Sequence, residues 1–163
     1  MSTALFRHVY DYHFAQNREI WDTAIVKLPQ EKFVQPIAYS IGSVRNHIVH
    51  MINVDNVWFS DLRGVEISAW HDPEDFPDRQ KIREMWDEVE QTMRDYLATL
   101  TNDMLTEKPL QGEDKDLFAW QALLQVANHG TDHRAQLLRN LHDLGAKTGP
   151  QDYIFYAYGN PVP

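Results

Sequence analysis

Four long segments of this 163-residue chain place apolar residues three or four positions apart, and no stretch of comparable length alternates between apolar and polar residues. The first spacing is that of an amphipathic α-helix, and the second is what a half-buried strand requires. A helix with one apolar stripe buries it by packing against other helices. The sequence therefore predicts an all-α fold, and its length suits a single domain over residues 1–163.

Capping and helix-breaking residues set the limits of these segments. Proline stops a helix, serine or aspartate caps the first turn, and glycine readily takes the left-handed conformation that follows a last turn. The predicted helices are residues 3–28 before Pro29, a second from near Ser43 to just before Gly64, a third from Asp78 to about Leu100, and a fourth over about 117–144 before Gly145. The connections 65–77 and 103–116 are long for a minimal bundle.

The C-terminal segment, about residues 146–163, ends in QDYIFYAYGNPVP and contains four aromatic residues. This composition is too apolar for a disordered tail. We expect the tail to pack back on the bundle or across a partner subunit.

Charge and hydropathy exclude several classes of function. The chain has 24 Asp and Glu against 15 Lys and Arg, a formal net charge of -9 with neutral histidines, so nucleic-acid binding is not expected. No run of about 18 uncharged apolar residues indicates a membrane span. The opening MSTALFRHVYDYHF lacks the apolar block of a signal peptide, and we expect a cytoplasmic protein.

The chain contains no cysteine. Disulfides, cysteine-containing zinc sites, CxxC redox chemistry and a cysteine nucleophile are therefore excluded together. Any thiol chemistry needs a thiol supplied from outside the chain.

Two of the eight histidines, His129 and His133, lie four residues apart in NHGTDHRAQ. On a helix they share one face and can direct their imidazoles at one point, a spacing that suits a divalent transition metal. The pair alone is equally compatible with chance in a histidine-rich chain. A third nitrogen ligand would distinguish the two readings.

The predicted second helix offers His47 and His50 as that third ligand. At about 100° per residue, His47 lies near the middle of the apolar arc and His50 at its margin. His129 and His133 also lie at a margin of their apolar stripe. Margins of adjacent helices meet at a seam that water or substrate can reach, which favours His50 as the ligand and leaves His47 to packing or to support of a ligand.

Two motifs give the chain a resemblance to a known family. SVRNHIVHMINVDNVWFSDLRG, residues 43–64, resembles the second-helix motif of the DinB/YfiT-like metalloenzymes, with Ser first, His seven residues later, then an acid and Trp. NHGTDHRAQ, residues 128–136, resembles their fourth-helix motif of two histidines followed by Arg, any residue and Gln. YHFAQNREIWDTAIVKLPQEKF is similar to their first helix.

The resemblance implies a four-helix bundle with a long crossover connection, and it puts His50, His129 and His133 at the family's three metal-ligand positions. It further implies zinc or nickel as the metal and often a homodimer. Some members of the family are transferases that use bacillithiol or mycothiol, and some are glutathione-dependent isomerases. A low-molecular-weight thiol is therefore an expected cosubstrate.

Two polar residues near the histidines are candidate catalytic groups. Asp55 lies in the apolar arc after His50; it either makes buried hydrogen bonds, which we favour, or orients a ligand or water. Gln136 projects from the same side as His129 and His133, where it either contacts bound water or substrate or is solvated. Arg134 points away from that edge and is expected to tie helices, or the acidic tail region, together.

Other site chemistries lack their motifs. No Glu-x-x-His, HExxH, G-x-S-x-G or glycine-rich phosphate loop is present. The sequence therefore favours a three-histidine metal site, open to water or a substrate sulfur, in an enzyme that transfers a thiol to small electrophiles. A metal-dependent hydrolase and a non-catalytic metal-binding bundle remain the alternatives.

Overall fold

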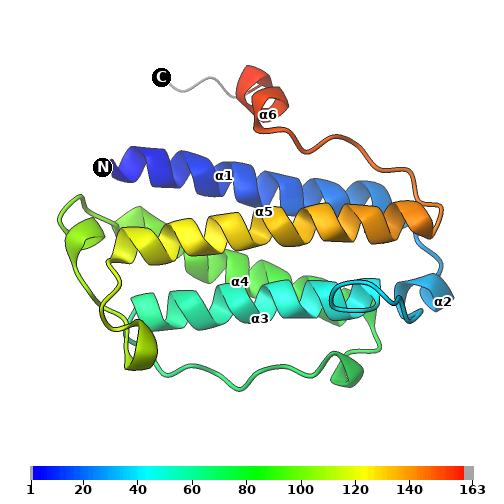
Figure 1. Ribbon diagram of the computed structural model, residues 1–163, viewed down its shortest axis with the longest axis horizontal. Helices are drawn as coiled ribbons and strands as arrows, with labels where there is room; N and C mark the ends of the chain where they lie inside the picture. Colours follow the sequence, from blue (N-terminus) through cyan, green and yellow to red (C-terminus); the bar gives the residue numbers. More distant parts are fainter. Residues whose placement is uncertain (1, 160–163) are drawn as a thin grey trace.

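The computed structural model describes residues 2–159, and its regular structure in that range is entirely helical, which confirms the all-α prediction. Four long helices form a bundle (Figure 1), and two short helices follow the first and the last of them. The long helices are α1 (Thr3–Ile20), α3 (Val44–Leu62), α4 (Arg79–Thr99) and α5 (Ala119–Asp143), and the short ones are α2 (Gln30–Phe33) and α6 (Tyr153–Gly159). No helix in the described range is both long and apolar enough to cross a membrane.

The predicted capping residues act at the starts of α3 and α4. The Ser43 hydroxyl accepts a hydrogen bond from the Asn46 amide at 3.1 Å, and the Asp78 carboxylate accepts one from the Gln80 amide at 2.9 Å. These contacts satisfy amides that have no partner within the helix. At the end of α5, Gly145 has a φ of +83°, a conformation that other residues adopt only under strain.

The first helix differs from its prediction over residues 3–28. Its α-helical part ends at Ile20, and residues Trp21–Ile25 form a π-helical turn, with the Val26 amide donating to the Trp21 carbonyl at 2.9 Å. The wider turn adds a residue without interrupting the helix, and Trp21 and Ile25 remain buried in the core. The apolar spacing alone does not distinguish this turn from a regular helix.

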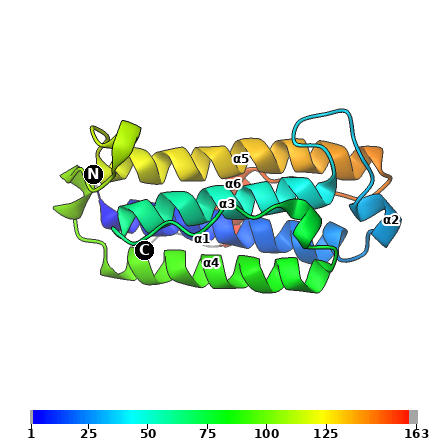
Figure 2. The ribbon, with the colours of Figure 1, turned by 90° about the horizontal axis from the view of Figure 1, so that it is seen from below.

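The long crossover is the segment between α3 and α4, which runs back along the outside of the bundle (Figure 2). Its side chains and backbone pair with positions progressively earlier in α3, so the segment runs antiparallel to that helix. The pairs are Ser68 with Asn56, His71 with Asn53, and Glu74 with Arg45. As a result α3 and α4 run parallel, and each of them packs against α1 or α5 as well.

A polar layer divides the core into two apolar clusters. One cluster contains Trp21 and Trp86, and the other contains Tyr10 and Phe59. Between them lie buried polar side chains from all four long helices: His13 and Asn17 of α1, Asp55 of α3, Glu90 of α4 and Arg134 of α5. Buried polar groups of this kind are costly unless they are paired, and this layer marks the height in the bundle at which the histidines gather.

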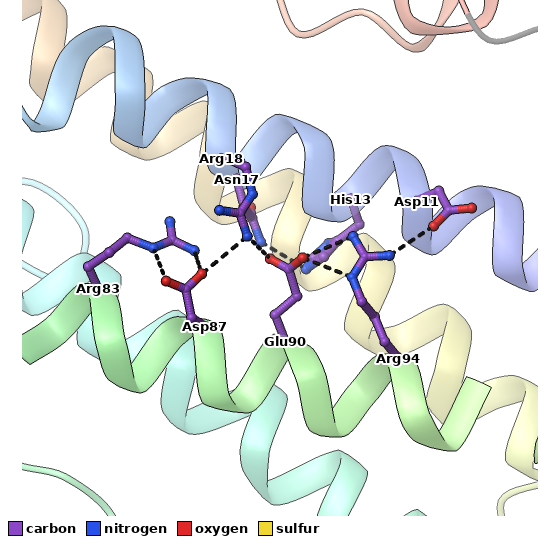
Figure 3. A network of polar contacts seen from close by, with 8 residues as sticks. All are labelled: Asp11, His13, Asn17, Arg18, Arg83, Asp87, Glu90 and Arg94. Atoms are coloured by element: carbon purple, nitrogen blue, oxygen red, sulfur yellow. Dashed lines mark hydrogen bonds and ion pairs between the residues drawn. The ribbon is translucent and has the colours of Figure 1, made fainter. Parts of the chain in front are cut away.

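Figure 3 shows how the α1 and α4 edge of this layer is neutralised. The buried Glu90 carboxylate accepts from Arg94 at 2.9 Å and from Arg18 at 3.3 Å. Arg18 also pairs with Asp87 at 3.1 Å, and Arg94 pairs with Asp11 at 3.2 Å. These alternating charges join α1 to α4.

The C-terminal segment runs back along α1 and ends in α6 (Figure 1). The Tyr153 hydroxyl lies 2.7 Å from His8 Nε2, and the rings of Tyr153 and Tyr156 pack against Tyr12. The predicted tail extends to residue 163, and its last part, 160–163, lies outside the described residues.

Candidate metal centre

Three histidines from two adjacent helices converge on one point. His50 lies on α3, and His129 and His133 lie one turn apart on α5. One ring nitrogen from each lies within 4.8 Å of the others, and the Nε2 atoms of His50 and His129 are 3.2 Å apart. The seam between α3 and α5 therefore presents three imidazole nitrogens to a single position, which can hold one metal ion.

The geometry agrees with shared coordination. Two imidazole nitrogens that bind one ion at about 2.0–2.1 Å, with tetrahedral or octahedral angles, are separated by about 2.9–3.4 Å. The separation of 3.2 Å between His50 and His129 falls in this range. A hydrogen bond between the His50 and His129 imidazoles would also give this separation. Such a bond would not explain the position of the third ring, because the His133 ring centroid lies only 4.1 Å from that of His129.

His47 supports the centre from behind. It is 0% exposed, and its Nε2 atom lies 3.1 Å from Nδ1 of His133. If His133 bound a metal through Nε2, its Nδ1 would carry a proton and would donate a hydrogen bond to Nε2 of His47. This contact fixes the ring of His133, as hydrogen bonds to ligand histidines generally do. The sequence-based interpretation of His47 as a buried packing or supporting residue agrees with this geometry.

The lowered pKa values of the clustered histidines also fit a metal. Burial first, and neighbouring histidines second, lower the pKa of His129 and of His47 to about 4. Burial also lowers the pKa of His50 and His133, although Asp55 raises both. All four rings are therefore neutral at pH 7, and a neutral imidazole is the form that binds metal.

Comparison with known proteins agrees with this geometry. A family model described as the DinB family matches residues 1–161. This chain belongs to the DinB family. Protein DinB of Bacillus subtilis (strain 168) is 25% identical to it over 167 aligned residues, covering 97% of this chain and 96% of that protein. The resemblance read from residues 43–64 and 128–136 is thereby confirmed.

Asp55 of this DinB-family chain lies in the polar layer and not in the histidine cluster. It is 2% exposed, and its Oδ2 atom lies 3.7 Å from Nε2 of His13 on α1. This placement accords with a buried structural partner. A role for Asp55 in orienting a ligand or water stays a prediction.

Gln136 is held at the surface of α5. Its amide nitrogen donates to Asp132 at 2.8 Å, and its amide oxygen accepts from the Ser40 hydroxyl. Both ends of the amide are therefore engaged beside the connection between α2 and α3. A contact between Gln136 and bound water or substrate would require one of these hydrogen bonds to exchange, and that contact also stays a prediction.

Arg134 ties α5 to α1, as its position on the helix predicts. It is buried, and its Nη1 atom donates to His13 at 3.0 Å and to Asn17 at 3.1 Å. Gly130 makes room for this network, because a Cβ atom there would lie 2.3 Å from Cε1 of His13. The apolar spacing of the sequence does not predict this network of His13 and Gly130; a glycine in the middle of an otherwise regular helix is the available signal.

Trp70 was also missed. It lies in the crossover, a segment without a recognised motif, and its ring centroid is 5.9 Å from that of His50. Only the path of the crossover along α3 brings it to the centre. Nothing in the local sequence around Trp70 indicates this contact.

Proposed function

We propose that this protein is a metal-dependent enzyme in which His50, His129 and His133 bind a divalent ion, zinc or nickel, and that it transfers an external thiol to small electrophiles. The observation that carries the proposal is the convergence of three neutral imidazoles within 4.8 Å. In the described part of the chain this cluster contains no fourth His, Cys, Asp or Glu. Three protein ligands leave positions for a substrate, as in catalytic sites.

The chain's own residues supply binding and orientation. His47 holds His133 in one ring orientation, and burial keeps the ligand rings neutral. When bound, the ion would supply the positive charge that lowers the pKa of a thiol or of water. The absence of cysteine makes an external thiol the source of sulfur.

The proposed reaction is a substitution at carbon. The thiol loses its proton to solvent, its sulfur forms a bond to the electrophilic carbon, and the leaving group departs with the electrons of the broken bond. The expected partners are small molecules and a second copy of the chain, and we propose no role for nucleic acid or a membrane. The expected location is the cytoplasm. Hydrolysis, in which water replaces the thiol, is the second candidate.

Metal content and activity test the proposal together. Protein purified without a His-tag is analysed for metal, stripped and reconstituted, then assayed with bacillithiol, mycothiol, glutathione or a simple thiol against a panel of electrophiles. Product should require both metal and thiol, and His129→Ala and His133→Ala should lose it while remaining folded. His142→Ala, an exposed histidine on α5, is the matched control. Turnover without thiol would favour hydrolysis, and metal binding without any turnover would favour a binding role.

A further inference from the structure

We propose that Trp70 determines the substrate specificity of the metal centre by binding a flat, aromatic group on the molecule held there. This inference rests on the proposed function, because it places a substrate at the three-histidine seam. It adds a chemical feature of that molecule, a planar aromatic ring, for which an aromatic thiol serves as the probe.

Trp70 is unusually exposed for its type. It is 57% exposed, whereas Trp21 and Trp86 are buried in the core and Trp58 and Trp120 are half-buried. Exposing this much apolar surface forgoes the free energy that burial would supply. A molecule bound against the ring would recover it.

Hydrogen bonds from α3 hold the crossover segment on both sides of Trp70. Asn53 of α3, which is 2% exposed, donates from Nδ2 to the His71 carbonyl at 2.9 Å and accepts from the His71 amide at 3.0 Å. Asn56 pairs with Ser68 on the other side of Trp70. A buried asparagine thus uses both ends of its amide to hold the residue that follows an exposed tryptophan.

The indole of Trp70 lies at the edge of the three-histidine cluster, beside His50. The Trp70 ring is tilted by 58° to the ring of His50, with centroids 5.9 Å apart. The His50 ring in turn lies 4.6 Å from that of His133. A ligand that occupies an open position beside His50 and extends toward the crossover would meet the indole, and aromatic rings prefer offset or edge-to-face contact at such distances.

The size of the expected effect follows from aromatic pairs in proteins. Such a pair is worth roughly 2-fold to 10-fold in binding beyond the area that it buries. Leucine in place of Trp70 would remove both the ring contact and part of the area. Phenylalanine would retain a flat ring at the same position.

The test measures thiol binding to protein loaded with cobalt(II), read from the absorption band that a cobalt-bound sulfur produces. The probes are benzyl mercaptan, which carries an aromatic ring, and 2-mercaptoethanol, which does not. The proteins are native, Trp70→Leu, Trp70→Phe and Phe155→Leu. Phe155 is the matched control, because it is 55% exposed and lies on α6, away from the three histidines.

Native protein should bind benzyl mercaptan more tightly than 2-mercaptoethanol. Trp70→Leu should weaken benzyl mercaptan about fivefold or more and leave cobalt and 2-mercaptoethanol affinity unchanged, while Trp70→Phe and Phe155→Leu should retain the preference. If Trp70→Leu still binds cobalt but changes the affinity of both thiols equally, or of neither, the role of Trp70 is overturned and the proposed function is not affected. If native protein binds no cobalt, or if neither thiol produces the absorption band of a cobalt-bound sulfur, both the proposed function and this inference are overturned.

Discussion

His47 Nε2 and His133 Nδ1 lie 3.1 Å apart in the interior of the bundle, between α3 and α5. The two histidines of α3 therefore have different surroundings: His50 presents its Nε2 atom to the cluster, whereas His47 contacts Nδ1 of the His133 ring. The difference arises from their separation of three residues, which turns one ring to the seam and the other toward the core.

Metal affinity should separate these two histidines. His50→Ala removes a ligand and should abolish tight binding of a divalent ion. His47→Ala removes only the support of His133 and should weaken binding by about 10-fold to 100-fold, with a loss of stability as well. Competition with a chelator gives both affinities, and His142→Ala is the control. Retention of metal by His50→Ala together with its loss in His47→Ala would reverse the assignment.

Gly130 should resist substitution although it lies inside a helix. Alanine there would gain up to about 1 kcal/mol of helix propensity, but its Cβ atom would lie 2.3 Å from His13. Overpacking of this kind costs about 1–3 kcal/mol, so Gly130→Ala should lower the free energy of unfolding measured in urea. In the double variant with His13→Ala the two losses should be less than additive, and simple additivity would show that the clash is relieved elsewhere.

Much of the bundle and of the histidine cluster could be predicted from local patterns. The capping of α3 by Ser43 and of α4 by Asp78, and the inward turn of His47, follow from spacing within one helix. The π-helical turn after Ile20 and the crossover contact of Trp70 with His50 do not. The apolar spacing does not distinguish the first from a regular helix, and the second depends on the path of a segment with no periodic pattern.

The crossover should depend on Asn53. Asn53→Ala removes both hydrogen bonds to the backbone of His71 and leaves its part-buried carbonyl and amide without that partner. Each lost hydrogen bond of this kind costs about 1–3 kcal/mol in the worst case, so we expect lower stability and faster proteolysis within residues 65–77. Asn56→Ala, which removes one exposed contact with Ser68, should have a smaller effect. Equal resistance of residues 65–77 to proteolysis in native protein and in Asn53→Ala would contradict the role of Asn53 in holding the crossover.

The stability of metal-free protein should fall in mild acid, in part through His13. Burial lowers the pKa of His13 below 6.5, and Arg134 of α5 lowers it further, while Asp55 of α3 and Glu90 of α4 act in the opposite direction. His13 takes up a proton at lower pH in the folded state than in the unfolded state. Its contribution to the free energy of unfolding is therefore fully present above about pH 6.5 and decreases as the pH falls below that value.

One such histidine contributes at most about 1.4 kcal/mol per pH unit to this slope. His13→Gln, which cannot titrate, should therefore show a shallower decrease in the free energy of unfolding between pH 7 and pH 5 than native protein. Urea unfolding in the presence of a chelator measures both slopes, and His142→Gln, at an exposed position, should match native protein. A slope that is unchanged in His13→Gln would contradict the lowered pKa of His13 in the folded chain.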